Sequence, residues 1–252
     1  MHKRLIPVLL IDRDKRLVKT VQFGARTYLG DPFNVVRLFN EKEVDELCLL
    51  DIDATRDGRT PDFDFLKELA SECFMPLSYG GGINSVAHCE RLNRVGIEKF
   101  VLGHCATRLD LVRSICDVVG SQAVVGCIDV LGRGSESKCV TSSGQTSLKP
   151  EQFCALLEDA GIGEIILQSI DCDGLRTGYD LDLIRRIVPG LTVPVVALGG
   201  AGTTHHLAAA LQAGASAAAS GSAFNFIGRL RAALITYPNR AEMDLRFMSD
   251  EF

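Results

Sequence analysis

Asp129 is the residue that the sequence places best for moving protons. It ends the apolar run 124–128, and further aspartates follow other apolar runs, at Asp51, Asp53, Asp171 and Asp173. An aspartate at the end of a buried strand works as a general acid or base when burial or a neighbouring charge tunes its pKa. For Asp51 and Asp53 the alternative, of equal weight, is that they cap the turn 55–59. Asp173 precedes a glycine, which is a turn signature. Asp129 is therefore the predicted catalytic residue.

Glycines follow several of the same apolar runs, at Gly80–Gly82, Gly103, Gly199–Gly202 and Gly221. Glycine lets backbone N–H groups approach an anion, and a following helix N-terminus adds favourable partial charge. The recurrence predicts two phosphate sites, the first of them weaker because the bulky His104 and Cys105 follow its last glycine. Lys19 is predicted to clamp a phosphate from a mobile lid, although a lone lysine is more often only solvated. The predicted phosphate- and substrate-binding residues are Lys19, Asp51, Gly81, Gly82, Asp173, Gly174, Gly200, Gly202, Gly221 and Ser222.

The chain repeats itself at a fixed offset. Gly81 and Gly199 are 118 residues apart (199 − 81), and Gly103 and Gly221 share that offset (221 − 103). Such periodicity indicates a fold built from two copies of one unit. At this offset Ile11 stands opposite Asp129, so only the second half carries the candidate acid.

Short β-branched runs alternate with amphipathic segments of helix length along the whole chain. The predicted strands are Leu5–Leu10, Glu46–Asp51, Pro76–Tyr79, Lys99–Leu102, Ala123–Asp129, Glu164–Ser169, Pro194–Leu198 and Ala217–Gly221. The predicted helices are Pro32–Lys42, Asp62–Cys73, Ser85–Val95, Leu109–Val119, Pro150–Ala160, Leu181–Val188, Thr204–Ala213 and Ala223–Tyr237. Alternation of this kind implies parallel strands joined by crossover helices.

Eight strand–helix units in 252 residues predict a (β/α)8 barrel, an α/β fold. We expect one domain over 1–252, made of half-barrel repeats at about 1–120 and 121–238, with a mobile tail at 239–252. Two flavodoxin-like half domains are the alternative. Each half would have only four strands, and closure of the halves on each other buries both open edges.

Composition limits the classes of function. The net charge of −5 offers no basic face for nucleic acid, and no apolar stretch approaches the roughly 20 residues that span a bilayer. We therefore expect a cytosolic protein without nucleic-acid or membrane partners. The nine cysteines include no Cys-x-x-Cys pair, and the adjacent His205 and His206 would point about 100° apart on a helix. We predict reduced thiols, no metal and no cofactor.

The motifs together resemble the HisF family, the cyclase subunit of imidazole glycerol phosphate synthase, over essentially the whole chain. The segments that carry the resemblance are Ile6-Pro7, Arg16–Lys19, Leu50–Asp53, Gly80–Ile83, Ile128-Asp129, Asp171–Gly174 and Gly199–Gly202. The resemblance implies that ammonia from a partner glutaminase crosses the barrel and reacts with a bis-phosphorylated substrate between two aspartates. Asp129 matches the second aspartate.

The first aspartate of that family is missing. Its position falls on Leu10 when the chain is aligned at Pro7, and on Ile11 by the internal repeat. A hydrocarbon side chain cannot transfer a proton, so the ring-closing reaction should be crippled unless Asp12 reaches in. The resemblance also implies an ammonia gate at the opposite end of the barrel, formed by Arg4, Glu46, Lys99 and Glu164. A stabilising layer of salt bridges is an alternative of comparable weight.

An ammonia route kept without the cyclase chemistry resembles a divergent HisF-like branch that works with a HisH-like glutaminase and a separate sugar amidotransferase. The segments that resemble it are Val8–Leu10, Asn40–Leu47, Ser71–Leu77 and Leu234–Pro238. The resemblance implies that the chain receives ammonia and passes it on for amidination of a sugar in surface polysaccharide. The first alternative is an active cyclase of histidine biosynthesis. The second is a scaffold that only stabilises the glutaminase.

Overall fold

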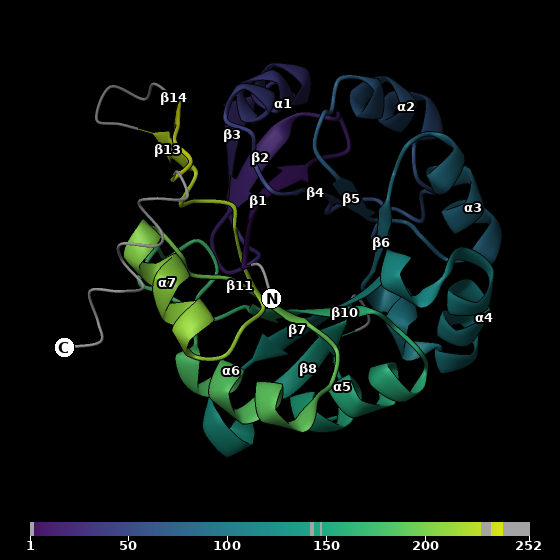
Figure 1. The fold of residues 1–252 in the computed structure, drawn as a ribbon, viewed down its shortest axis with the longest axis vertical. Coiled ribbons are helices and arrows are strands. Elements are labelled where there is room, and N and C mark those ends of the chain that lie inside the picture. Colours follow the sequence, from purple (N-terminus) through teal and green to yellow (C-terminus); the bar gives the residue numbers. More distant parts are fainter. Residues whose placement is uncertain (1–2, 142–143, 147, 228–232, 239–252) are drawn as a thin grey trace.

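Eight parallel strands close into a barrel with helices between them, so the predicted (β/α)8 fold is confirmed (Figure 1). The computed structural model describes residues 3–141, 144–146, 148–227 and 233–238, and the predicted tail lies outside them. Pairing of the last barrel strand with the first completes the ring. The barrel strands are β1 (Arg4–Ile11), β4 (Leu47–Asp51), β5 (Leu77–Gly80), β6 (Lys99–Leu102), β7 (Val124–Leu131), β10 (Glu164–Ser169), β11 (Val195–Leu198) and β12 (Ala217–Ser220).

Helices surround the strands as an outer ring (Figure 1). Most begin where a short polar side chain accepts a hydrogen bond from a backbone N–H group of the first turn, as Asp31, Asp62 and Ser85 do. Seven of the eight predicted helices are confirmed within two residues at either end. They are α1 (Pro32–Glu41), α2 (Phe63–Ser71), α3 (Val86–Arg94), α4 (Leu109–Val119), α5 (Pro150–Asp159), α6 (Leu181–Ile187) and α7 (Thr204–Gln212).

The eighth predicted helix, Ala223–Tyr237, is wrong. Its described residues form the antiparallel strands β13 (Asn225–Ile227) and β14 (Ala233–Ile235). Both strands contain β-branched or aromatic residues, which lose side-chain freedom in a helix and favour extended backbone. Tyr237 then ties this segment to the barrel, because its hydroxyl donates to the backbone oxygen of Leu5 at 3.0 Å.

Two apolar layers lie on opposite sides of the barrel wall. Leu5, Leu9 and Ile11 of β1 pack outward in the layer between strands and helices. The other layer fills the lumen and consists of Ile6, Val8, Cys48, Val101, Val125, Ile166, Val196, Leu198, Ala217 and Ala219, with the partly exposed Leu10, Leu50 and Cys127. Because side chains alternate along a strand, these memberships fix which residues face the lumen.

Two hairpins were not among the predicted strands. The segment after β1, expected to be a lid loop, forms β2 (Leu17–Thr20) and β3 (Arg26–Gly30), with β2 antiparallel to β1. Lys19 therefore belongs to a strand. The second hairpin follows β7 and consists of β8 (Lys138–Thr141) and β9 (Gly144–Gln145). Both hairpins follow the carboxyl end of a barrel strand, and loops at that end carry function in barrels of this type.

Candidate active site and charged ring

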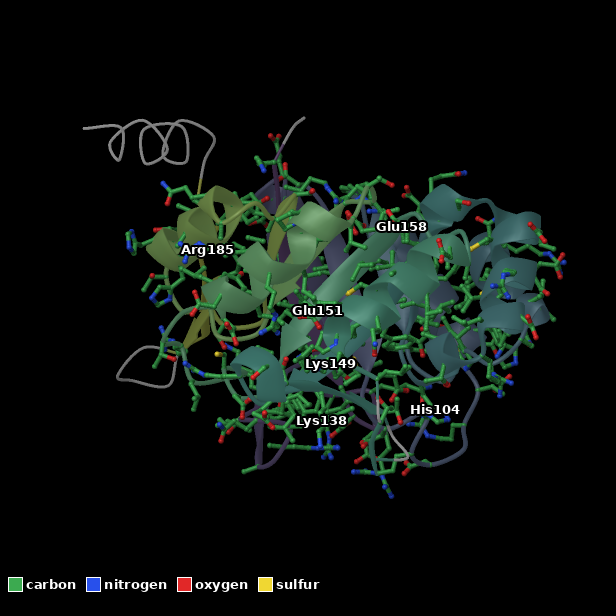
Figure 2. The ribbon with its side chains drawn as sticks, turned by 90° about the horizontal axis from the view of Figure 1, so that it is seen from below. His104, Lys138, Lys149, Glu151, Glu158 and Arg185 are labelled. Carbon is green, nitrogen blue, oxygen red and sulfur yellow. The ribbon has the colours of Figure 1, made fainter. Side chains whose placement is uncertain are left out.

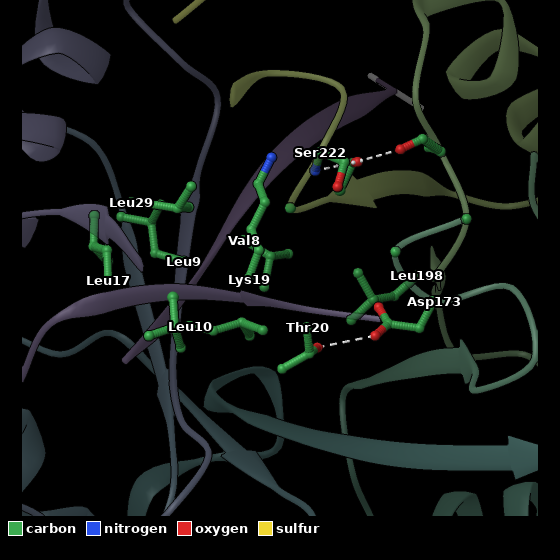
Figure 3. A pocket seen from close by; sticks show the side chains of 17 residues that line it. Val8, Leu9, Leu10, Leu17, Lys19, Thr20, Leu29, Asp173, Leu198 and Ser222 are labelled. Atoms are coloured by element: carbon green, nitrogen blue, oxygen red, sulfur yellow. Dashed lines mark hydrogen bonds between the residues drawn. The ribbon is translucent and has the colours of Figure 1, made fainter. Parts of the chain in front are cut away.

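The mouth of the barrel holds a small cavity of about 30 Å³ at the carboxyl ends of β1, β11 and β12 (Figure 3). Its walls bring together six of the ten residues that the sequence predicted for phosphate or substrate binding: Lys19, Asp173, Gly174, Gly200, Gly221 and Ser222. Leu10, Leu17 and Leu29 form its apolar side. The cavity therefore joins the second-half glycines to a lysine from the first hairpin.

Lys19 and Asp173 are the charged groups of this cavity. Burial, with the Arg176 guanidinium as a second cause, lowers the pKa of Lys19 to about 8. Burial also raises the pKa of Asp173, against the hydrogen bond that Thr20 Oγ1 donates to its carboxylate at 3.1 Å. Lys19 therefore remains mainly protonated at neutral pH and gives the cavity a cation suited to an anionic group.

Ser220 organises the backbone beside this cavity, and the sequence analysis missed it. Its hydroxyl accepts from the N–H groups of Ser222 and Ala223, at 3.1 and 3.0 Å, and donates to the oxygen of Ala201. The repeat offers a signal for it, because the counterpart of Ser220 at the 118 offset is the apolar Leu102 (220 − 118). The two halves thus differ in how their glycine loops are held.

Gly81 and its second-half counterpart Gly199 have the same packing reason to be glycine. A side chain on Gly81 would meet the backbone oxygen of Asp51 at 2.6 Å, and one on Gly199 would meet that of Ser169 at 2.5 Å. Both glycines have positive φ, +128° and +95°. Glycine at these positions is therefore required by strand–loop packing, whether or not an anion binds.

Four predicted binding residues lie away from the cavity walls: Asp51, Gly81, Gly82 and Gly202. The N–H group of Gly82 donates to Thr55 Oγ1 at 3.3 Å, and that of Gly202 donates to His206 Nδ1 at 3.1 Å. His104, in the first-half loop, is exposed. In the side view of Figure 2 it lies with Lys138 near one end of the barrel, and Glu158 lies near the other.

Asp129 faces the lumen below the mouth. It shares that face of β7 with Cys127, whose thiol donates to its carboxylate at 3.8 Å. Burial raises the pKa of Asp129 to about 7; the Cys127 thiol opposes this effect, and the Asp173 carboxylate adds to it. On β10 the residue paired with it in the parallel register is Gln168. A carboxyl group with this pKa can both accept and release a proton near neutral pH.

Leu10 is the lumen-facing counterpart of Asp129 on β1. Ile6, Val8 and Leu10 face the lumen, whereas Ile11 packs in the outer layer, so the assignment to Ile11 by the internal repeat is wrong. A slip of one residue moves a strand's side chains to its other face. The position opposite the acid is therefore occupied by hydrocarbon.

Asp12 does not reach into the lumen. Its carboxylate accepts from the backbone N–H groups of Asp14 and Arg16, at 2.9 and 3.0 Å, and from the Arg16 guanidinium at 3.1 and 3.2 Å. It caps the turn between β1 and β2. These bonds leave Asp129 as the lumenal carboxylate among the described residues of β1 and β7.

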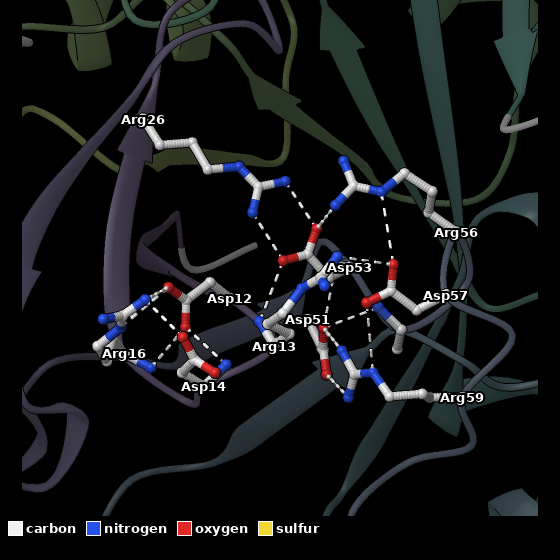
Figure 4. A network of polar contacts seen from close by, with 11 residues as sticks. Asp12, Arg13, Asp14, Arg16, Arg26, Asp51, Asp53, Arg56, Asp57 and Arg59 are labelled. Carbon is white, nitrogen blue, oxygen red and sulfur yellow. Dashed lines mark hydrogen bonds and ion pairs between the residues drawn. The ribbon is translucent and has the colours of Figure 1, made fainter.

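Asp51 and Asp53 belong to a network of aspartates and arginines beside the mouth (Figure 4). Asp53 is fully buried and accepts from Arg26 at 2.6 and 2.7 Å and from Arg56 at 2.6 Å. Hydrogen bonding to Arg26 is the main reason that its pKa falls to about 2. Asp51 accepts from two backbone N–H groups and from Arg59. These bonds favour the capping alternative for both residues.

A closed ring of four charges lies at the amino-terminal end of the barrel. Lys99 Nζ donates to Glu46 at 2.8 Å and to Glu164 at 2.9 Å, and Arg4 donates to the same two carboxylates, to Glu46 at 2.6 Å. Glu46 and Glu164 are only 4% and 5% exposed, so the two carboxylates of the ring are held away from water. Removal of either cation would leave each buried carboxylate with one cationic partner instead of two.

Among the described residues there is neither a cluster of metal ligands nor a membrane-spanning helix. No group of three or more acidic, histidine or cysteine residues there is arranged to hold a metal ion. None of the described helices is long and apolar enough to cross a membrane. All nine cysteines, from Cys48 to Cys172, have free thiols.

The fold and site define a class: a (β/α)8 barrel with its candidate chemistry at the carboxyl ends of the strands. A family model described as histidine biosynthesis protein matches residues 4–230, and the chain belongs to that family, among its HisF subunits. The chain is 37% identical over 241 residues to the imidazole glycerol phosphate synthase subunit HisF of Nocardioides sp., covering 91% of this chain and 93% of the relative.

Two other relatives are more similar, and both have provisional names. The hisF2 subunit of imidazole glycerol phosphate synthase from Pseudomonas aeruginosa is 44% identical over 250 residues, covering 97% of this chain and 99% of the relative. The hisF3 subunit from Vibrio vulnificus is 43% identical over 248 residues, covering 96% and 95%. Numbered names of this kind are consistent with a divergent copy of HisF.

Proposed function

We propose that this chain is the HisF-like subunit of a glutamine amidotransferase complex. It receives ammonia from a HisH-like glutaminase and passes it on for amidination of a sugar in surface polysaccharide (LPS O-antigen) biosynthesis, with a separate sugar amidotransferase as the recipient. The observation that carries the proposal is Leu10, which faces the lumen where a second acid would be needed. The chain thereby keeps a barrel for transport and lacks the pair of acids.

The two ends of the barrel support different parts of this proposal. The ring of Arg4, Glu46, Lys99 and Glu164 closes the amino-terminal end, where ammonia from a glutaminase would enter. Above it the lumen is largely apolar, and such a surface neither protonates ammonia nor retains it by hydrogen bonds. The numbered names of the relatives from Pseudomonas aeruginosa and Vibrio vulnificus support a role beside the ordinary subunit. The acceptor sugar rests on the resemblance alone.

An active cyclase of histidine biosynthesis is the second candidate. The pKa of Asp129, about 7, favours it, because one well-tuned acid can serve part of a two-acid reaction. The cavity with Lys19 and the second-half glycines also suits a phosphorylated substrate. Under this candidate the reaction would proceed without a partner for Asp129.

Purified protein supplied with the cyclase substrate and an ammonium salt separates the two candidates. The proposal predicts no turnover by the wild type. Turnover that Asp129→Asn abolishes would refute the proposal and establish the cyclase. Leu10→Asp returns a carboxyl group to the lumenal face of β1 and gives a comparison variant for the same assay.

The conduit is tested by the glutamine-dependent product of the whole complex. Glu46→Ala and Lys99→Ala are expected to lower it while glutamine hydrolysis continues, since ammonia is then lost at the ring. Glu46→Gln keeps an acceptor for Lys99 and should retain more of the product. Arg113→Ala, which removes an exposed ion pair with Asp110 on α4, is the control. Unchanged product formation in both ring variants, with the complex intact, would favour a scaffold.

A further inference from the structure

The backbone pairing of β1 with β4 begins above the level of the charged ring. The parallel register between the two strands starts at Val8, opposite Cys48. The same offset of 40 (48 − 8) would place Leu5 opposite Asp45, at the height of the ring. Buried backbone N–H and C=O groups need partners, so the groups of Leu5 that face this side must find them elsewhere than in the ladder.

Asp45 and Tyr237 take the place of that pairing. The N–H group of Leu5 donates to Asp45 Oδ2 at 2.9 Å, and the Tyr237 hydroxyl donates to the backbone oxygen of Leu5 at 3.0 Å. The same hydroxyl accepts from the backbone N–H group of Asp45 at 3.1 Å. One phenol oxygen therefore bridges the backbone of β1 and the segment that leads into β4. We call these three residues the Tyr237 clamp.

The Tyr237 clamp lies next to two members of the charged ring. Leu5 follows Arg4 in the chain, and Asp45 precedes Glu46. Arg4 Nη1 donates to Glu46 at 2.6 Å, so any movement of the β1 backbone away from the start of β4 lengthens this ion pair directly. Lys99 binds the same carboxylate at 2.8 Å, and it would lose that contact when Glu46 moves.

The aromatic ring of Tyr237 is fixed from the other side. Its centroid lies 5.4 Å from that of Phe224, which is fully buried, with an angle of 35° between the two planes. The neighbouring Thr236 donates its N–H group to the backbone oxygen of Phe224 at 2.9 Å. Replacement of Tyr237 by phenylalanine keeps this packing and removes only the hydroxyl group.

We propose that Tyr237 is a positioning residue of the charged ring. With Asp45 it sets the separation of Arg4 and Glu46 and so keeps the four charges in contact. The hydroxyl bonds to backbone groups, and it acts on the ring through the positions of those backbones. The consequence for ammonia rests on the proposed function, in which ammonia enters the barrel through this ring.

Reaction of lysine amines with acetic anhydride reports whether the charged ring is closed. The full-length protein is acetylated under native conditions, and the rate at Lys99 is measured by mass spectrometry relative to the exposed Lys138. Tyr237→Phe should raise the relative rate at Lys99 about fivefold, the factor expected when the closed form loses one hydrogen bond. Asp45→Ala should have a similar effect. Asp45→Asn keeps an acceptor for the N–H group of Leu5 and should retain more of the protection.

Tyr179→Phe is the matched control. It also removes a phenol hydroxyl, one that is buried and donates to the backbone oxygen of Ala219 at 2.8 Å. This variant should leave the relative rate at Lys99 unchanged. An equal rise in Tyr179→Phe would show a general loosening of the barrel and overturn the positioning role. An unchanged rate at Lys99 in both Tyr237→Phe and Asp45→Ala would overturn it as well.

The consequence for ammonia is measured on the whole complex. Tyr237→Phe should lower the product formed per glutamine hydrolysed, while product formed from an added ammonium salt stays the same. If Lys99→Ala lowers this ratio and Tyr237→Phe does not, the inference is wrong and the proposed function stands. If neither variant changes the ratio although Tyr237→Phe opens Lys99 to acetylation, the proposed function is wrong and the positioning of the ring stands.

Discussion

Replacement of Asp129 by asparagine should stabilise the protein, and by more at alkaline than at acidic pH. The variant keeps the shape of the side chain and removes its charge. Below pH 3.8 the wild-type carboxyl group is protonated in both the folded and the unfolded state and does not lower the free energy of unfolding. Between pH 3.8 and about 7 the unfolded chain releases the proton while the folded chain retains it, so wild-type stability falls as pH rises. Above about pH 7 the loss is complete.

The magnitude follows from the two pKa values. A rise from 3.8 to about 7 corresponds to a total of roughly 4 kcal/mol at about 1.36 kcal/mol per unit. Much of that loss falls between pH 5 and pH 8. Asp129 keeps a partly exposed surface at the mouth, where water screens its charge. We therefore expect the advantage of Asp129→Asn over the wild type to grow by about 2 kcal/mol between these two pH values.

Urea unfolding of both proteins at pH 5, 6, 7 and 8 measures this difference. Asp182→Asn, at an exposed site on α6, is the matched control and should show no such trend. An advantage of Asp129→Asn that is constant across the series would refute the argument from burial. An advantage that decreases with pH would show that the folded protein stabilises the ionised form, which burial of the carboxyl group cannot do.

Three further predictions concern other parts of the molecule. Asp53→Asn should lower the free energy of unfolding by about 2 kcal/mol near neutral pH, because hydrogen bonding to Arg26 lowers the pKa of Asp53 to about 2. This loss of stability should disappear as pH falls from 3.8 towards 2, as measured by urea unfolding. Phe74→Ala should weaken binding of the glutaminase about tenfold in a titration, because Phe74 is 86% exposed at the amino-terminal end of the barrel. Leu38→Ala, which changes an exposed residue on α1, should leave the binding unchanged. Gly174→Ala should speed hydrogen exchange across 17–30, because its φ is +72° and a side chain there meets the hairpin backbone at Thr20; equal exchange in both proteins would contradict this.

Phe74 is held in position although it is exposed. Its N–H group donates to Asn40 Oδ1 at 3.0 Å, and the amide nitrogen of Asn40 donates to the oxygen of Glu72 at 2.6 Å. The same loop continues to Pro76, whose oxygen accepts from Leu47, the residue after Glu46 of the ring. A rigid aromatic side chain loses little conformational freedom on binding, which is why such residues serve as anchors at interfaces.

Local sequence patterns were sufficient to predict the barrel. The limits of β6 and β10 agree with prediction at both ends, because each apolar run begins with a charged residue, Lys99 or Glu164. The hairpin of β2 and β3 was missed, because β3 is exposed or only partly buried and lacks the apolar alternation of a core strand. Periodicity predicts burial, so it identifies only the strands that burial stabilises.

The site was harder to predict, because it depends on contacts between distant residues. Arg26 and Asp53 are 27 residues apart, and no motif links them. Gln168 lies beside Asp129 only because β10 pairs with β7 in this register. The internal repeat even assigned the wrong residue of β1 to the lumen, since an offset that holds for the glycines is one residue off for that strand. Registers and faces follow from the closed sheet as a whole.

The buried charged groups at the two ends of the lumen differ in how they are paired. Buried charges at the entrance are paired within the ring, so each carboxylate there already has its cations. At the exit the Asp129 carboxylate accepts only the weak thiol bond of Cys127 among the described residues, and Leu10 on the opposite strand is a hydrocarbon that cannot pair with it. A polar group that is left unsatisfied in the native state is either a cost or a place for a ligand. The contrast between the two ends is consistent with the proposed passage of ammonia, from an entrance where the charges are paired to an exit that holds one acid.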